Sequence, residues 1–210
     1  MAKESKNEKI ITIVLAIIIS IAAITIMYVS LPNDSDTDTD DQEDDNGGET
    51  PPVVEENILT LTYGEQELDY TLSELEEMES YSGSGSQLKM GALPDIIIKG
   101  PYNFTGVRFS TLFNEIDKLP SNYSISITAT DGYPSPPFSK NNVDGVTDIY
   151  NDTGNVTGNS GATMVLAYKE DGEYISEEDG PLRVVFVGED IITASNLWAK
   201  MVATIEIAEV

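Results

Sequence analysis

The most continuous apolar stretch of the chain lies near its N-terminus, where IITIVLAIIISIAAITIMYVSL at 10–31 holds no charged residue. A helix of this length, rising about 1.5 Å per residue, spans a hydrocarbon core of roughly 30 Å. A cleaved signal peptide and a buried core helix are the alternatives. The run is longer than the apolar region of a signal peptide, and no small-residue cleavage site follows it. The pattern therefore predicts a retained transmembrane helix.

The residues on either side of this helix predict its orientation. Lys3, Lys6 and Lys9 precede it, whereas the thirty residues that follow contain no Lys or Arg. Basic flanks stay on the cytoplasmic side of a membrane. We therefore expect a single-pass protein of the cell membrane, with a cytoplasmic tail at 1–9 and an extracellular C-terminal domain.

An acidic segment at 32–57 follows the predicted helix. It holds eleven Asp or Glu residues, no base, and the pairs Gly-Gly and Pro-Pro. Charge repulsion and the lack of apolar anchors predict an extended, disordered linker. The spacing Asp36-x-Asp38-x-Asp40 resembles the start of an EF-hand calcium loop, but Asp41 and Gly47 stand where that loop needs Gly and Glu. The segment is better explained as a stalk.

The pattern from Ile58 onward changes to short alternating stretches. This alternation, with a small number of apolar runs, predicts strands at 58–63, 68–70, 95–99, 123–130, 163–169, 183–188 and 198–208. The capping box Thr71-Leu72-Ser73-Glu74 predicts a helix to about Glu79, and 110–116 has helical spacing. The residues at 58–210 are thus expected to form one α+β domain with a mixed sheet.

Three polar segments of this domain are predicted to be irregular. YSGSGS at 81–86 predicts a flexible loop, and the Gly- and Asn-rich stretch at 141–161 predicts a long surface loop. The acids at 177–179 are expected in a solvated turn rather than in a pair of catalytic carboxylates. The aromatic and Pro-rich segment at 133–138 suits contact with a ligand or partner, or packing as a rigid loop.

Composition restricts the chemistry. The chain has no Cys and no His, which removes the usual general base, the thiolate nucleophile and the soft metal ligands. Its formal net charge is −26, and the residues from Ile58 onward carry 24 acids against eight bases. Nucleic acids and anionic lipid head groups are therefore poor partners.

Asparagines in the pattern N-x-[ST] mark possible glycosylation sites, since the topology above places them outside the cell. They are Asn33, Asn103, Asn122, Asn151 and Asn155. Asn151 and Asn155, in the predicted long loop, are the best candidates. Chance occurrence in an Asn- and Thr-rich chain is the alternative.

Five short segments follow one another in a recognisable order. They are FTGVRFSTLF at 104–113, DGY at 131–133, LAYKEDGE at 166–173, GPLRVV at 180–185 and WAKMVATIEI at 198–207. Together they resemble the sulfite-oxidase-type molybdopterin-binding domain over roughly 58–207, which implies that fold. Arg108, Tyr133 and Arg183 match motif positions, and the resemblance implies that they contact a cofactor. A purely structural role in hydrogen bonds or ion pairs is the alternative for each.

The chain differs from this family at the residues that bind the metal and its cofactor. The family binds molybdenum through a Cys thiolate, and the corresponding region at 81–100 offers only Ser82, Ser84 and Ser86. Leu197 occupies the motif position of the family's Lys, and Val187 occupies that of its Pro. The family's His ligand has no counterpart, since the chain has no His. We therefore predict no bound cofactor.

Three functions remain open at this point. The first is a non-catalytic extracellular domain that binds an unidentified small ligand or a cell-surface protein. The second is a molybdopterin-dependent oxidoreductase with an atypical site, which predicts a basic pocket formed by Arg108, Arg183 and Lys200. The third is a structural component of the cell envelope, which predicts no enclosed pocket.

Overall fold

The structure is a computed structural model that describes residues 55–90 and 96–210. The predicted tail, the transmembrane helix at 10–31 and nearly all of the predicted linker lie outside the described residues. Among the residues described, no helix is long and apolar enough to cross a membrane.

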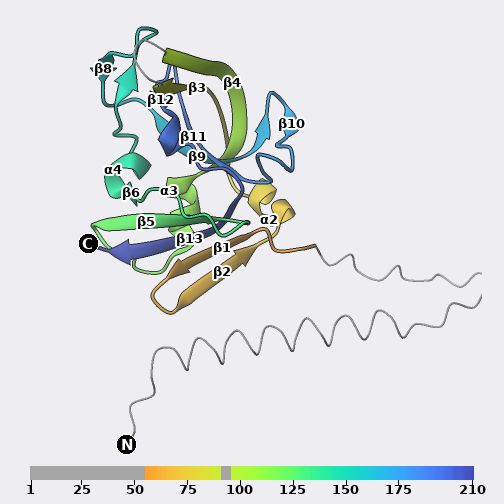
Figure 1. Ribbon diagram of the computed structural model, residues 1–210. Helices are drawn as coiled ribbons and strands as arrows, with labels where there is room; N and C mark the ends of the chain where they lie inside the picture. The colour runs from red at the N-terminus through yellow and green to blue at the C-terminus, as the bar shows by residue number, and fades with distance from the viewer. Residues whose placement is uncertain (1–54, 91–95) are drawn as a thin grey trace, which may run out of the picture. The chain divides into compact units, whose positions relative to one another are not determined.

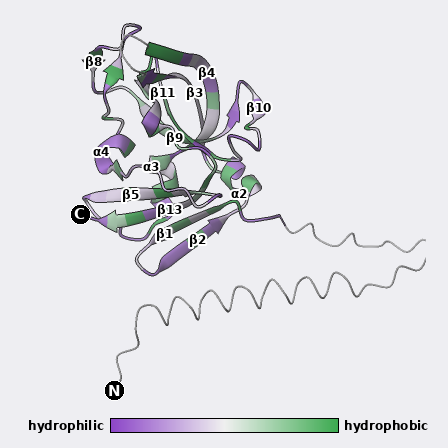
Figure 2. Cartoon of the chain, viewed as in Figure 1, coloured by the Kyte–Doolittle hydropathy of each residue, from purple (hydrophilic) through white to green (hydrophobic). Residues whose placement is uncertain are grey.

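Five strands form the first sheet, in the order β2-β1-β13-β5-β6 (Figure 1). They are β1 (Leu59–Tyr63), β2 (Gln66–Tyr70), β5 (Tyr123–Ala129), β6 (Phe138–Ser139) and β13 (Val202–Glu209). β1 and β13 run parallel, and the other neighbours run antiparallel. Figure 2 shows β2 as a hydrophilic edge strand, which suits a position with one unpaired side.

The second sheet has the order β10-β9-β4-β3-β12, and β11 also pairs with β9. Its strands are β3 (Ser80–Met90), β4 (Ile96–Arg108), β9 (Thr163–Glu170), β10 (Glu173–Tyr174), β11 (Arg183–Val187) and β12 (Ile192–Ala194). β12 pairs parallel with β3, so this sheet is mixed as well. The described part of the chain is therefore a sheet-rich domain with few helices, as the α+β prediction expects.

The helices are short and join the strands. They are α2 (Leu72–Glu77), α3 (Phe109–Leu112), α4 (Lys140–Val143) and the 3-10 turns η1 (Phe113–Glu115) and η2 (Ser195–Leu197). The predicted capping box is present, since the Thr71 side chain accepts from the Glu74 backbone N–H and the Glu74 side chain accepts from the Thr71 N–H. The helical spacing at 110–116 is confirmed as α3 followed by η1.

The hydrophobic core has two parts because β9 and β11 are buried on both faces. Along β11, Val184 and Phe186 belong to the main core, whereas Val185 and Val187 belong to a second cluster on the opposite face. The main core also takes the inward side chains of β1, β5 and β13. This double burial explains why β11 is an unbroken apolar run after its first residue, Arg183.

The prediction of a flexible loop at 81–86 is wrong. These residues lie inside β3, which pairs with β4 from Ser80 to Met90. The glycines are there for packing, because a Cβ on Gly85 would lie 2.3 Å from the Phe186 carbonyl oxygen and one on Gly83 would lie 2.9 Å from Val187 Cγ2. Small residues let β3 cross close over β11.

Two other boundaries differ from the prediction. The stretch at 141–161 contains most of α4 and a small hairpin of β7 (Ile149–Tyr150) and β8 (Val156–Gly158), so it is not simply a loop. The last strand begins at Val202 rather than at Trp198. Trp198 instead follows η2 and is buried in the second cluster.

Candidate functional site

A pocket of about 320 Å³ opens between the β3–β4 hairpin and the loop before β13, and we call it the cationic pocket. Its charged lining consists of the bases Lys89, Lys99, Arg183 and Lys200 and the acids Glu170 and Asp179. Half of the eight bases from Ile58 onward therefore line one pocket. In a domain where acids outnumber bases threefold, this clustering makes the pocket locally positive.

Strand register brings two of these lysines to one face of the hairpin. Lys99 on β4 stands opposite Gln87 on β3, and Lys89 lies two residues further along β3. Alternate residues of a strand point to the same face, so Gln87, Lys89 and Lys99 share one side. Leu88, between them, points to the other side and is 2% exposed.

Arg183, the first residue of β11, forms the floor of the pocket. Strand alternation places its side chain on the same face as Val185 and Val187, and it is only 3% exposed. Its guanidinium carbon lies 5.5 Å from the centre of the Trp198 ring and 5.8 Å from that of Phe104. Aromatic faces favour a cation at this range, so the rings fix the charge in place.

Two carboxylates pair with this buried guanidinium. Arg183 Nη1 lies 3.0 Å from Glu170 Oε2 and 3.6 Å from Asp179 Oδ2. Asp179 also pairs with Lys200 through its other oxygen. Arg183 Nε, by contrast, finds no hydrogen-bond partner within the described residues. A buried donor left without a partner is costly, so the Arg183 side chain is held at some expense to stability.

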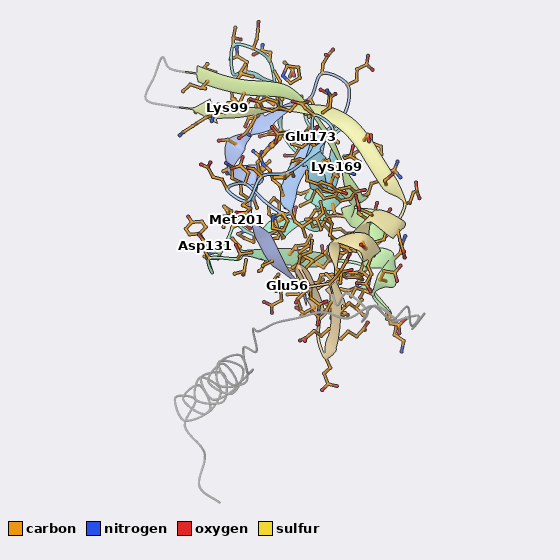
Figure 3. The ribbon with its side chains drawn as sticks, turned by 90° about the vertical axis from the view of Figure 1, so that its right-hand side faces the viewer. Glu56, Lys99, Asp131, Lys169, Glu173 and Met201 are labelled. Atoms are coloured by element: carbon orange, nitrogen blue, oxygen red, sulfur yellow. The ribbon has the colours of Figure 1, made fainter. Side chains whose placement is uncertain are left out.

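A second, mostly apolar hollow of about 360 Å³ adjoins the first, and we call it the Tyr133 pocket. Its apolar lining includes Ile127, Tyr133, Pro136, Trp198 and Met201. Ser195 and Lys200 line both hollows, so the two are neighbours. In Figure 3, Lys99 lies above Met201 and Asp131 on the same side of the domain.

The three residues predicted to contact a cofactor fall in three places. Arg183 lines the cationic pocket and Tyr133 lines the adjoining hollow. Arg108 lines neither of them, because its guanidinium stacks 4.2 Å from the centre of the Tyr81 ring and pairs with Glu79 at 3.0 Å. The basic pocket predicted from Arg108, Arg183 and Lys200 thus contains the last two, and Lys89 and Lys99 replace Arg108.

Sequence reasoning missed Lys89 and Lys99 as pocket residues. Once 81–86 is read as a loop, the nine residues between these lysines give no register for a hairpin. The sequence held one signal for them. The domain has only eight bases, so each of these could have been considered as a candidate for an anion-binding pocket. Glu170 and Asp179 were missed because their pairing with Arg183 depends on how β9, β11 and the turn before β11 meet.

The residues of this region do not fit a molybdenum centre of the sulfite-oxidase type. Such a centre needs a thiolate, and the chain has no cysteine. The serine hydroxyls that stand in its place are far poorer ligands for a soft metal. Two of the three serines are also unavailable, since Ser82 Oγ lies 2.8 Å from Thr105 Oγ1 and Ser86 is 5% exposed. No group of three or more acidic side chains within the described ranges could hold a metal ion.

Comparisons with known proteins give a distant structural likeness. No family model matches the chain, and no curated protein matches its sequence. Among solved structures, the chain is similar to the sulfane dehydrogenase SoxCD from Paracoccus pantotrophus, at 16% identity and a TM-score of 0.47. The match covers 71% of this chain and 37% of that one, so the chain spans little more than a third of its neighbour. The likeness concerns the fold alone, and only distantly.

Proposed function

We propose that this chain is a membrane-anchored, outward-facing binding protein, and that its C-terminal domain binds a small anion in the cationic pocket without catalysing a reaction. The observation that carries the proposal is the concentration of Lys89, Lys99, Arg183 and Lys200 around one hollow of a strongly acidic domain. A surface arranged only for solubility gives no reason for such a cluster.

The arrangement of these charges suits a ligand with negative charge. Arg183 is buried and fixed by two aromatic rings, whereas Lys89, Lys99 and Lys200 are exposed and their long side chains can move toward a ligand. The fixed cation at the floor gives a bound anion a defined position, and the exposed cations at the rim attract the anion as it approaches. Ser195 and Gln87 add groups that hydrogen-bond oxygen atoms.

The cationic pocket also helps to judge the two alternative functions, a structural envelope component and an atypical oxidoreductase. A structural envelope component gives no reason for four of the eight bases to line one hollow, so this cluster favours a binding role. An oxidoreductase with an atypical site needs a metal ligand that replaces cysteine, and the donors described above do not supply one. Elemental analysis of the purified full chain tests this directly, since stoichiometric molybdenum together with oxidation of sulfite would overturn the non-catalytic proposal.

Binding is tested by titrating the full chain in nonionic detergent with inorganic phosphate in a calorimeter. We expect saturable binding that weakens about tenfold in the double variant Lys89→Gln, Lys99→Gln, because two ligand-facing charges are lost. The matched control is Lys118→Gln, Lys140→Gln, which changes the net charge equally outside both hollows. Equal weakening in both variants would show a general charge effect and would contradict a specific pocket.

Glycans are proposed at the sequons of the outward-facing domain. Asn103, Asn122 and Asn155 are exposed, whereas the Asn151 carboxamide oxygen accepts from the Thr153 N–H at 3.0 Å and the Asn155 N–H at 2.9 Å. The bonds to this oxygen leave the Asn151 nitrogen to carry a sugar. A mass decrease on glycosidase treatment, lost in the Asn→Gln variants, supports the proposal, and an unmodified peptide mass contradicts it.

A further inference from the structure

We infer that the ligand of this site is an amphipathic organic anion, with its anionic group in the cationic pocket and a flat apolar body in the Tyr133 pocket. The inference rests on the proposed function, because it names the chemical class of the anion that the cationic pocket binds. Its basis is the contact between two hollows of opposite character.

The two hollows lie next to each other and share one wall. Ser195, the first residue of η2, and Lys200, in the loop that follows Trp198, line both of them. A molecule whose charged group contacts Lys200 from the cationic side therefore has the Tyr133 pocket directly beside it. Each hollow alone, at about 320 and 360 Å³, lies near the lower end of the range of small-molecule sites. Together they accommodate a charged group joined to a ring system.

Tyr133 provides an exposed aromatic surface in the apolar half. Its side chain is 72% exposed although its backbone is held on both sides. The Tyr133 N–H donates to Asp131 Oδ1 at 2.9 Å, and its carbonyl accepts from the Ala129 N–H at 3.0 Å. An aromatic side chain exposed on a well-held turn loses little entropy when a flat ligand stacks on it.

Charge sets the direction in which such a ligand lies. Asp131 is the carboxylate that lines the Tyr133 pocket, and it does not line the cationic pocket. An anionic group near Asp131 is repelled, whereas the same group beyond the shared wall meets Lys200 and its cationic neighbours. The site therefore favours a molecule with one anionic end, and it disfavours both a neutral ring compound and a ligand with an anionic group at each end.

The test compares inorganic phosphate with 1-naphthyl phosphate, which carries the same anionic group on a flat apolar body. Both are titrated into the full chain in nonionic detergent, with blank titrations into detergent alone. We expect 1-naphthyl phosphate to bind about tenfold more tightly than inorganic phosphate. Tyr133→Ala should remove this difference and leave the affinity for inorganic phosphate unchanged, while Tyr133→Phe should keep the difference.

Tyr174→Ala is the matched control, because Tyr174 is also an exposed tyrosine, at 55%, and lines neither hollow. Equal affinities for the two compounds, or an advantage that survives Tyr133→Ala, would overturn this inference and leave the proposed anion site standing. Failure of both compounds to bind would overturn the proposed function itself, and this inference with it.

Discussion

Lys200 at the wall between the two hollows forms an ion pair with Asp179, which also faces the buried guanidinium of Arg183. The Asp179 carboxylate thus sits where an incoming anion would contact both cations. It acts as an internal competitor for the site, and its turn is held by the hydrogen bond from its N–H to the Ser176 carbonyl at 3.0 Å.

The first prediction follows from this competition. Asp179→Asn removes the competing charge and nearly keeps the shape of the side chain. We expect the affinity for inorganic phosphate to rise roughly 2- to 5-fold, the factor that corresponds to a charge interaction of up to about 1 kcal/mol. Calorimetry of the full chain measures it. Glu178→Gln, in the same turn but outside the pocket lining, is the control, and an equal rise there would argue against a local effect.

The second prediction concerns the close contact between β4 and β9. A Cβ on Gly106 would lie 2.1 Å from the Leu166 carbonyl oxygen, at the point where the register of the two strands shifts. Because backbone must move to admit a methyl group, Gly106→Ala should destabilise the domain by about 1–3 kcal/mol or more. Chemical denaturation followed by circular dichroism measures this loss.

Gly158→Ala is the matched control for that substitution. It also lies in a strand, and a Cβ there meets no atom within 4 Å. The same change of residue type should therefore alter the free energy of unfolding by less than about 0.5 kcal/mol. If Gly106→Ala proved as mild as Gly158→Ala, the close approach of β4 to β9 would be wrong.

The third prediction concerns an ion pair between α2 and β9. Lys169 Nζ lies 3.0 Å from Glu76 Oε1, and the Tyr174 hydroxyl donates to the same oxygen at 3.0 Å. The hydrogen bond from Lys169 is the largest cause that lowers the pKa of Glu76 below its ordinary value. A carboxyl group whose pKa is lowered on folding stabilises the domain above its unfolded pKa, and this contribution is lost as the pH falls through the folded value.

Glu76→Gln should therefore lower the melting temperature at neutral pH, and the difference from the native chain should shrink as the pH falls below about 4.5. Thermal unfolding at a series of pH values measures this difference. Glu77→Gln, the neighbouring exposed residue of α2, is the control. A difference that stays constant down to acid pH would show that Glu76 does not act through its charge.

Much of the fold was accessible from the sequence because local patterns coincide with the final packing. β1, β5, β9 and β11 lie where alternating or continuous apolar residues predict strands, and the capping box marks the start of α2. β3 was missed because its glycines and serines have low strand propensity. Their role depends on Phe186 and Val187 of β11, which lie a hundred residues further along the chain.

The candidate site was only partly accessible for a similar reason. Arg183 and Tyr133 could be singled out by motif, but which residues share a hollow with them depends on strand register and on the loop that carries Lys200. Arg108 matches a motif position equally well and is engaged with Tyr81 and Glu79 instead. A motif position identifies a residue type, whereas the partners of that residue are set by the tertiary fold.

Anion binding at Arg183 can be followed through the neighbouring tryptophan. Trp198 is the only tryptophan of the chain, its indole N–H donates to Thr193 Oγ1 at 2.8 Å, and its ring contacts Arg183 beneath the cationic pocket. Its indole resonance in a ¹H–¹⁵N NMR spectrum therefore reports on the Arg183 floor of the cationic pocket and on the Tyr133 pocket, which Trp198 lines, and the lysine variants distinguish the two. On titration of the full chain with inorganic phosphate, we predict a saturable shift of this resonance.

The shift should persist in the Lys118→Gln, Lys140→Gln variant. In the Lys89→Gln, Lys99→Gln variant, it should require about tenfold more phosphate. An indole resonance that does not move, or that moves equally in both variants, would contradict an anion-binding site at Arg183.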